Sequence, residues 1–341
     1  MKNFAIYRMP YADTCVEIIQ HEGEPEQLMS PLQLNGKKGF VVAPFDVSDK
    51  EPILLIRPDE TRTFAAPQHD TQTKTETADD TTGTGTPGGR SYYAIDFSSF
   101  HAQLESGAFQ KIVLARCAEL PRNNNIEMRE LFERACLLYP RVFVALVSTE
   151  VSGTWLIASP EILLEGNVEG WHTMALAGTM TLGNLQWSEK NICEQAYVTS
   201  YITKCIEQFT TDFSVEGPYS VRAGQLVHLR TDFRFKAPKE EALGRLIAAL
   251  HPTPAVCGIP KHDTRDFIIR NEHTPRNYYS GFMGPLDMAG ATHLYVSLRC
   301  MQIKPDRYRL YAGGGILADS IEQQEWEETE EKMKTMRNIL Y

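Results

Sequence analysis

The sequence contains no cysteine pattern that would support a disulfide framework or a zinc site. Its seven cysteines are an odd number, and no two of them form a CxxC pair. Evenly paired or closely spaced cysteines are the usual signature of both kinds of site. We therefore expect reduced thiols and a cytoplasmic protein.

Long apolar runs and an excess of positive charge are also absent. The N-terminal stretch "MKNFAIYRMPYADTC" lacks the apolar core of a signal peptide, and no uncharged run is long enough to span a bilayer. The formal net charge is −10, from 34 Lys and Arg against 44 Asp and Glu. Neither nucleic acid nor a membrane is therefore a predicted partner, and an anionic ligand would need local cations or a bound metal.

Nucleotide-binding motifs are missing as well, although three glycines follow an apolar run in "LYAGGGILADS". Gly313, Gly314 and Gly315 lack the GK[ST] ending of a phosphate loop and the GxGxxG spacing of a dinucleotide site. Two interpretations remain open for them. They form either a turn that needs a positive φ or a nest of backbone N–H groups that binds an anion such as a carboxylate.

An acidic helix pattern, "EQQEWEETEEKMKTM", follows these glycines. Glu325, Glu328 and Lys332 fall at i, i+3 and i+7, so they share one helix face. Glu328 and Lys332 form either an ordinary i,i+4 ion pair or a hard-cation ligand beside an anion-binding lysine. Magnesium prefers one or two protein carboxylates, completed by water and substrate oxygens.

One low-complexity segment, residues 67–90, reads "PQHDTQTKTETADDTTGTGTPGGR". It has few apolar side chains, so it cannot bury enough surface to offset the entropy of ordering. The segment before it is short for an independent domain. We therefore interpret 67–90 as a mobile loop within a single domain, 1–341, rather than as a linker between domains.

Strand and helix patterns are mixed along the rest of the chain, and no βαβ repeat carries a dinucleotide fingerprint. Hairpin-spaced strands with helices between them predict an α+β fold with a mixed, mostly antiparallel sheet. Asp96 is a plausible cap for the first helix and Gly107 its stop. We predict helices over 95–107, 126–139, 189–209, 239–250 and from 324 onward, and strands over 110–120, 141–148, 153–159, 292–303 and 306–313.

Several polar residues stand in contexts that suggest chemistry. Lys111 opens the strand "KIVLAR" beside small apolar residues, so it lies either in a cavity, where it could act as a base, or at a sheet edge. Glu161, at a strand end, is either an acid or a turn former. Glu194 lies on an apolar helix face, where a carboxylate needs a partner. Arg299 ends a strand and could bind a carboxylate, whereas a lone His251 in a loop is more often structural.

Taken together, five segments resemble the chorismate-utilising enzymes, the family of anthranilate synthase component I, and among them the isochorismate synthases. The segments are "KIVLAR", "ASPEILL" with "LAGT", "EKNICEQA", "HPTPAVCGIPK" with "RNYYSGFMG", and "SLRC" with "YAGGGILADSIEQQEWEETEEK". The resemblance covers about 97–341, and the N-terminal part shows no match. It implies large, mostly antiparallel sheets packed face to face, with helices outside.

The resemblance also implies a Mg²⁺ ion and a set of residues that hold chorismate. The ion would bind Glu194 and Glu328, with Glu325 in support, and would hold the ring carboxylate together with Gly178 and Thr179. His251 would face the reacting edge of the ring. The enolpyruvyl carboxylate would be held by Tyr279, Arg299, Lys332 and the amides around Gly313, Gly314 and Gly315.

The implied reaction is the isomerisation of chorismate to isochorismate, a precursor of menaquinone and catecholate siderophores. Water would attack C2 while the C4 hydroxyl leaves, with Lys111 as base and Glu161 as acid. Lys111 must then be uncharged and Glu161 protonated. We expect a monomer without an obligatory glutaminase subunit.

Related enzymes with other chemistry are the main alternatives. Anthranilate synthases typically carry glutamine at the position of Lys111, and aminodeoxychorismate synthases usually carry a lysine at the position of Ala177, so this pair of residues favours water over ammonia. Salicylate synthases share the same residues and then expel pyruvate, and a non-catalytic chorismate binder is a further alternative. Gln195 and Gly314 depart from the family pattern, which usually has histidine and often alanine at these positions.

Overall fold

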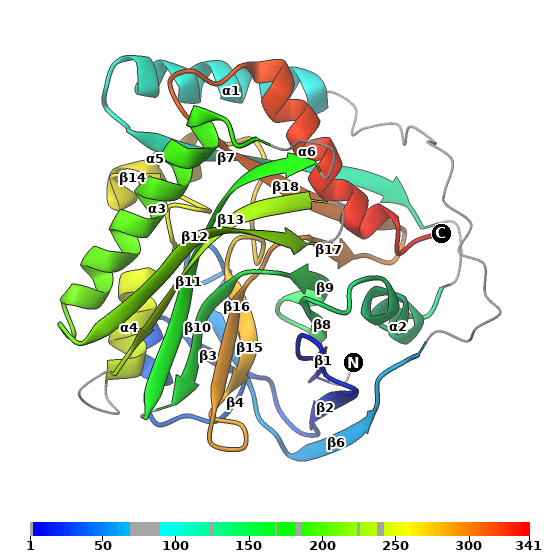
Figure 1. The fold of residues 1–341 in the computed structure, drawn as a ribbon. Coiled ribbons are helices and arrows are strands. Elements are labelled where there is room, and N and C mark those ends of the chain that lie inside the picture. The colour runs from blue at the N-terminus through cyan, green and yellow to red at the C-terminus, as the bar shows by residue number, and fades with distance from the viewer. Residues whose placement is uncertain are drawn as a thin grey trace.

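A computed structural model describes most of the chain (Figure 1). None of the helices in these described segments is long and apolar enough to cross a membrane. Most of the loop predicted over 67–90 lies outside the described residues, so its interpretation as a mobile loop stays a prediction. The interpretation of 1–341 as a single domain also stays a prediction. The described residues are 3–68, 89–122, 126–167, 169–181, 186–223, 226–236 and 242–341.

Two nine-stranded sheets, whose paired strands all run antiparallel in the described residues, form the body of the molecule. The first sheet has the order β14 (Gly258–Ile259), β7 (Lys111–Pro121), β18 (Arg307–Ile316), β17 (Cys300–Ile303), β9 (Gly153–Ser159), β8 (Phe143–Thr149), β1 (Asn3–Arg8), β2 (Thr14–Gln20) and β6 (Glu60–Ala65). The second has the order β12 (Phe213–Ala223), β13 (Leu226–Phe235), β11 (Gly170–Thr181), β10 (Ile162–Asn167), β16 (Thr292–Val296), β15 (Phe282–Leu286), β4 (Gly39–Ala43), β5 (Ile53–Ile56) and β3 (Glu26–Leu28).

The two sheets pack face to face through apolar side chains. Successive residues of a strand point to opposite faces, so a strand buried on both sides is apolar throughout. In β8, Phe143, Ala145 and Val147 lie in the core between the sheets, whereas Val144 and Leu146 face an outer cluster. The ring of Phe143 stacks on Tyr295 of the opposite sheet, with centroids 4.3 Å apart. The α+β fold with stacked antiparallel sheets is thus confirmed.

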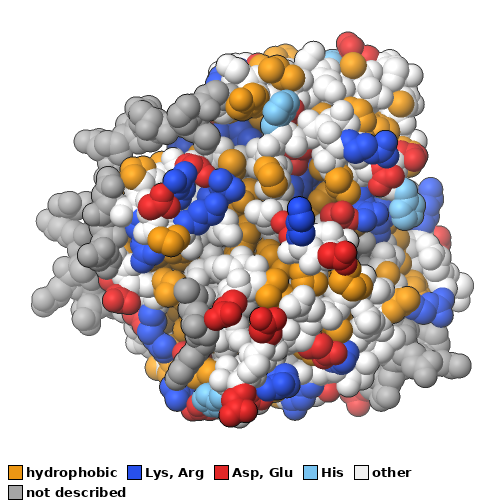
Figure 2. Space-filling view, turned by 180° about the vertical axis from the view of Figure 1, so that it is seen from behind, with side chains coloured by type: hydrophobic (Ala, Val, Ile, Leu, Met, Phe, Trp, Pro, Cys, Tyr) orange, Lys and Arg blue, Asp and Glu red, His pale blue; other side chains and the backbone are white. Residues whose placement is uncertain are grey.

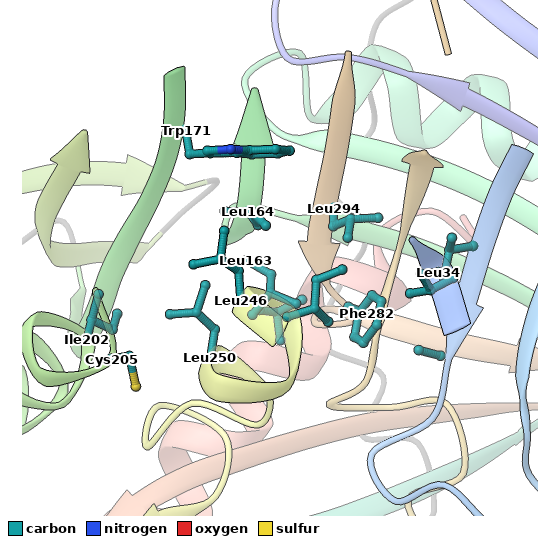
Figure 3. Close-up of a cluster of buried hydrophobic side chains, with 14 of the residues drawn as sticks. Leu34, Leu163, Leu164, Trp171, Ile202, Cys205, Leu246, Leu250, Phe282 and Leu294 are labelled. Atoms are coloured by element: carbon teal, nitrogen blue, oxygen red, sulfur yellow. The ribbon is translucent and has the colours of Figure 1, made fainter. Parts of the chain in front are cut away.

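The helices cover the outer faces of these sheets (Figure 1). Those of the first sheet are α2 (Met128–Leu138) and α6 (Glu322–Arg337), which pack in one outer cluster, and α1 (Gly89–Glu105) and α5 (Lys261–Asn271), which pack near β7. Over the second sheet lie α3 (Glu189–Glu207), α4 (Ala242–Leu250) and a short 3₁₀ helix, Pro31–Leu34. Figure 3 shows Leu246 and Leu250 of α4 among Leu163, Phe282 and Leu294 of the strands.

The N-terminal part, for which the sequence offered no match, completes both sheets. Strands β1, β2 and β6 extend the first sheet, and β3, β4 and β5 extend the second. On the face shown in Figure 2, acidic and basic side chains are intermixed over the described residues.

Two predicted elements were wrong in detail. Helix α1 begins at Gly89, so Asp96 is not its cap: it is buried within the helix and accepts a hydrogen bond from the His273 backbone N–H at 3.0 Å. The strand predicted over 292–303 is two strands in different sheets, β16 and β17. The chain crosses between the sheets at 297–299, where Arg299 has a φ of +45°. The remaining predicted elements are confirmed within one turn of their ends, as far as the structure describes them.

Candidate active site

A cavity lies where strands of both sheets meet α3 and α6, and it contains most of the predicted site residues. Its unfilled volume is about 620 Å³, part of which is open to solvent. The predicted residues in its lining are Glu161, Gly178, Thr179, Glu194, Tyr279, Arg299, Gly313, Gly315 and Lys332. Residues separated by up to 171 positions in the sequence, Glu161 and Lys332, therefore meet in one site.

The three glycines lie in a strand rather than in a turn. In β18, Gly313, Gly314 and Gly315 pair with Ala115, Leu114 and Val113 of β7, and none of the three has a positive φ. The interpretation of this stretch as a turn that needs a positive φ was therefore wrong, and anion binding by its N–H groups stays a prediction. Strand β17 begins at Cys300, opposite Tyr311, so the residues of β18 after Tyr311 have no partner in β17. Gly313 and Gly315, in this part of β18, line the cavity.

Close approach of side chains explains why this strand contains glycine. A Cβ atom on Gly315 would lie 2.1 Å from Glu194 Oε1 and 2.9 Å from Lys111 Cε. A Cβ atom on Gly313 would lie 2.8 Å from the Tyr279 hydroxyl oxygen. Glycine within a strand often marks such an approach. At Gly314, by contrast, the nearest atom to a Cβ would be Glu325 Oε2 at 3.2 Å.

This difference predicts the outcome of two alanine substitutions. Gly315→Ala should displace Glu194 and Lys111 and lower kcat/KM about 10²-fold, because misplacement by about 1 Å is that costly in an active site. Gly314→Ala needs a shift of only a few tenths of an ångström at a side-chain end, so it should keep most of its activity. Steady-state kinetics on both variants, with circular dichroism to verify folding, would measure this; equal losses would contradict the assignment.

Lys111 is fully buried and contacts Glu194, a residue of the cavity lining. It has no exposed surface, and its Nζ forms an ion pair with Glu194 Oε1 at 2.9 Å. Although Lys111 begins strand β7, this strand is covered by β14 on one edge and β18 on the other. The interpretation as a sheet-edge lysine was therefore wrong. Glu194, on α3, belongs to the cavity lining, whereas Lys111 does not.

Two further lysine–glutamate pairs flank this one. Lys332 Nζ lies 2.6 Å from Glu328 Oε1 and donates to the carbonyl of Gly313 at 2.7 Å. Lys190, near the start of α3, pairs with Glu325. Burial alone would raise the pKa of Glu328, but the charges of Lys332 and Lys190 outweigh it and lower that pKa. Burial and the neighbouring Glu328 raise the pKa of Glu325 despite its pairing with Lys190.

The carboxylates Glu194, Glu325 and Glu328 converge on the strand of Gly314 and Gly315. Their chemistry suits a hard cation, since all are oxygen donors and Glu325 Oε2 is buried without a hydrogen-bond partner in the described part of the chain. Within the same residues, no three His, Cys, Asp or Glu side chains form a closed metal cage. A site with one or two protein carboxylates is what magnesium prefers.

Glu161 is buried at the cavity wall, immediately after β9, with only 1% of its surface exposed. Burial raises the pKa of its carboxyl to about 8, and the nearby charge of Lys111 reverses only part of this rise. Its Oε1 has no hydrogen-bond partner among the described residues. Glu161 is therefore protonated at neutral pH and able to donate a proton.

Arg299 and Tyr279 contribute donors on another side of the cavity. Burial lowers the pKa of the Arg299 guanidinium to about 10, which leaves it charged at neutral pH. Its Nη1 is buried and has no partner in the described residues, whereas Nη2 lies 3.2 Å from His228 Nε2. Burial also raises the pKa of Tyr279, so its hydroxyl keeps its proton. These groups are suited to an anionic ligand.

His251 is not in the cavity lining. Its Nε2 lies 3.2 Å from the carbonyl oxygen of Pro44, and its ring packs against Phe282. Sequence reasoning missed His228, which does line the cavity, and Lys190. The alternation of "LVHLRTDF" could have indicated a half-buried strand carrying His228 on one face, but it contains no signal for which cavity that face lines.

The chain is thus an α+β protein of two stacked antiparallel sheets, with a cavity whose lining contains two glutamates, one arginine and one lysine. Residues 53–341 match the family described as chorismate binding enzyme, so the chain belongs to that family. The match begins further towards the N-terminus than the predicted boundary at 97.

Relatives of the chain include named isochorismate synthases. Isochorismate synthase EntC of Escherichia coli strain K12 is 31% identical over 67% of this chain, and the matched region is 62% of that relative's length. Isochorismate synthase DhbC of Bacillus subtilis strain 168 is 29% identical over 91% of this chain and 83% of its own length.

Solved structures share the fold over nearly the whole chain. The putative 2,3-dihydroxybenzoate-specific isochorismate synthase DhbC from Bacillus anthracis has a TM-score of 0.82 at 24% identity, covering 99% of this chain and 96% of that one. Anthranilate synthase component I from Streptococcus pneumoniae has a TM-score of 0.68 at 16% identity, covering 98% and 89%. Because enzymes with different chemistry share this fold, the residues of the cavity must distinguish between them.

Proposed function

We propose that this protein is an isochorismate synthase, which converts chorismate to isochorismate. The observation that carries the proposal is a fully buried lysine, Lys111, close to a cavity that contains Arg299 and the buried Glu161, whose pKa is raised to about 8. The relatives named isochorismate synthase support it. Isochorismate supplies menaquinone and catecholate siderophore synthesis, and either pathway suits the proposed product.

Chorismate is a dianion, and the cavity offers donors for both of its carboxylates. Arg299, Lys332 and the Tyr279 hydroxyl would hold the enolpyruvyl carboxylate beside the part of β18 that has no partner in β17. Gly178 and Thr179 would lie against the ring carboxylate. Hydrogen bonds from arginine and lysine to a carboxylate fix the orientation of the ring as well as binding it. Such orientation accounts for much of the rate acceleration in reactions of this kind.

Glu194 and Glu328 would hold a magnesium ion, with Glu325 in support. When bound, the ion would neutralise the ring carboxylate and so favour its entry into an acidic site. Each of these glutamates is also paired with a lysine. The lysines therefore keep the three carboxylates from repelling one another.

The reaction adds one water and releases another, so chorismate and isochorismate are isomers. Lys111 would take a proton from the water that attacks C2, and to do so it must first release the proton that it holds in the ion pair with Glu194. Glu161 would give its proton to the C4 oxygen, which leaves as water when the C4–O bond breaks. Each group supplies about 10²–10⁴ in rate in typical acid–base catalysis.

Residues in the cavity argue against the ammonia-using members of the family. Lys111 stands where anthranilate synthases typically have glutamine, and Ala177, which lines the cavity, stands where aminodeoxychorismate synthases usually have a nucleophilic lysine. A cytoplasmic monomer without a glutaminase subunit is in keeping with a water-dependent reaction, because no ammonia has to be delivered.

The identity of the product tests the proposal. Purified protein is incubated with chorismate and Mg²⁺, and the products are separated by chromatography. Isochorismate without salicylate is the expected result. Salicylate with pyruvate would make the protein a salicylate synthase, and binding of chorismate without any product, in the presence or absence of ammonia, would make it a non-catalytic binder.

Removal of divalent cations should abolish turnover and leave the protein folded. We expect activity to vanish in excess EDTA and to return when Mg²⁺ is restored, because the ion held by Glu194 and Glu328 would bind the ring carboxylate of the substrate. Calorimetric titration of the metal-free protein with Mg²⁺, with and without Glu328→Gln, provides a measure of binding that does not depend on turnover. Full activity after exhaustive chelation would contradict the metal assignment.

A further inference from the structure

A β-bulge opposite His228 shapes one wall of the cavity. Strand β11 pairs with β13 regularly up to Ala177, opposite Leu229, and resumes at Met180, opposite Val227. Gly178 and Thr179 therefore face a single residue, His228. Such bulges re-aim side chains and backbone groups beside active sites. Here Gly178 adopts a φ of +68°, and its carbonyl oxygen points to His228 Nδ1, 2.9 Å away.

The other ring nitrogen of His228 contacts Arg299. Nε2 lies 3.2 Å from Arg299 Nη2, and the imidazole is only 5% exposed. A guanidinium is always a donor and a backbone carbonyl always an acceptor. The two contacts therefore define one uncharged tautomer, in which Nδ1–H donates to Gly178 and Nε2 accepts from Arg299.

We propose that His228 is a positioning residue, an uncharged acceptor that fixes Arg299 against the Gly178–Thr179 bulge while leaving the arginine's charge available to an anionic ligand. This inference rests on the proposed function, because it deepens the role of Arg299 as a carboxylate-binding group. His228 links the two segments that would hold the two carboxylates of the substrate.

The strain and the burial around Arg299 explain why such a residue is needed. Arg299 lies where the chain crosses between the sheets, with a φ of +45° that is unfavourable for a side-chain-bearing residue. Its long side chain has many rotamers, and fixing them costs entropy that a preorganised contact removes before the ligand binds. Nη1 stays without a partner among the described residues and so remains available for a ligand oxygen.

The charge of the residue at 228 matters as much as its position. An aspartate or glutamate there would also orient Arg299, but it would form an ion pair and reduce the attraction of Arg299 for an anion. A protonated histidine would repel Arg299 and lose the acceptor lone pair. Burial and the charge of Arg299 lower the pKa of His228 to about 3, which agrees with the uncharged tautomer derived from the contacts.

The test measures binding of chorismate in a Glu161→Gln background, where turnover is slowed about 10²–10⁴-fold and the shape of the site is kept. Calorimetry should give a chorismate Kd that rises about 10- to 100-fold when His228→Ala is added, as expected for loss of a hydrogen bond to a charged group. In protein with Glu161 intact, KM should rise more than kcat falls.

Two conservative variants separate positioning from packing. His228→Gln places an acceptor near the Nε2 position, so it should restore much of the affinity. His228→Asn keeps a donor near Nδ1 but cannot reach Arg299, so it should bind as weakly as His228→Ala. His293→Ala, on β16 and outside the cavity lining, is the control and should leave Kd unchanged.

The outcomes separate the positioning role of His228 from the proposed function of the protein. An unchanged Kd in His228→Ala, or recovery with Asn and not with Gln, would overturn the positioning role while the proposed function stands. If Glu161→Gln protein with His228 intact shows no binding of chorismate at all, the proposed function and this inference both fail.

Discussion

Replacing Lys111 with glutamine should lower kcat by about 10²–10⁴, the range typical for loss of a general base. Glutamine is uncharged and nearly as long as lysine, but its amide cannot accept a proton from water at neutral pH. The variant should also lose stability, because Lys111 is fully buried in an ion pair with Glu194, and removing one partner of a buried pair costs about 3–5 kcal/mol.

Loss of stability must be separated from loss of catalysis. Lys261→Gln is the control, because Lys261 is half-buried and donates to the carbonyls of Ala248 and Ala249, away from the cavity lining. It should lower the free energy of unfolding with little effect on kcat. Urea denaturation and steady-state kinetics on both variants measure the two effects. A Lys111→Gln variant that keeps more than a tenth of wild-type kcat would rule out Lys111 as the base.

Replacing Glu161 with glutamine should have a similar effect on kcat, about 10²–10⁴, since an amide cannot protonate the leaving C4 oxygen. The wild-type enzyme should also lose kcat as the pH rises through about 8, the pKa to which burial raises the Glu161 carboxyl, because only the protonated form is active. The residual activity of Glu161→Gln should lack this alkaline limb. A residual activity with the same alkaline limb would assign the limb to another group.

The same substitution should change stability in a pH-dependent way. The folded protein keeps a proton on Glu161 up to about pH 8, whereas an unfolded glutamate releases it near 4.5. The folded wild type is therefore progressively destabilised as the pH rises from about 4.5 to 8. Glu161→Gln removes this dependence and should be more stable than wild type by about 3–5 kcal/mol at pH 8.

The stability measurement has a clear control. The advantage of Glu161→Gln should shrink towards zero near pH 5, as measured by urea denaturation at a series of pH values. Glu207→Gln, at an exposed position of α3, should show no such trend. If the free energies of unfolding of Glu161→Gln and wild type differed by the same amount across this range, Glu161 would be ionised in the folded protein. That result would rule out Glu161 as the acid. A gain in stability with a loss of activity is the trade-off expected at a catalytic position.

Much of the fold could be predicted from local patterns. Strands such as β7, β8 and β9 are short apolar runs bounded by turn residues, and α2 and α3 carry the helical spacing of apolar residues. These signals depend only on neighbouring residues. The ordering of strands into two sheets depends on pairs distant in sequence, and local patterns carry no information on it.

The failures have tertiary causes. The glycines of β18 suggested a turn because glycine is rare in strands, but the approach of Glu194 and Lys111 to the backbone excludes a side chain at Gly315. The alternating run around Arg299 suggested one strand, whereas the chain crosses there from one sheet to the other. Asp96 suggested a helix cap, but it is an internal acceptor for His273.

Those residues of the site that stand in recognisable sequence motifs could be predicted. Glu161, Glu194 and Lys332 stand in such motifs, and the structure brings them into one cavity lining with Arg299. His228 could not be found this way, because its contact with the Gly178–Thr179 bulge depends on the register of β11 against β13. The pairing of Lys190 with Glu325 likewise joins two helices that are distant in sequence.

The origin of the new hydroxyl oxygen tests the central claim most directly. The enzyme is incubated with chorismate and Mg²⁺ in ¹⁸O-enriched water, and isochorismate is sampled before equilibrium and analysed by mass spectrometry. If Lys111 activates a solvent water for attack at C2 while Glu161 releases the C4 hydroxyl, the product carries one ¹⁸O at C2. Isochorismate without ¹⁸O, or no isochorismate at all, would contradict the account.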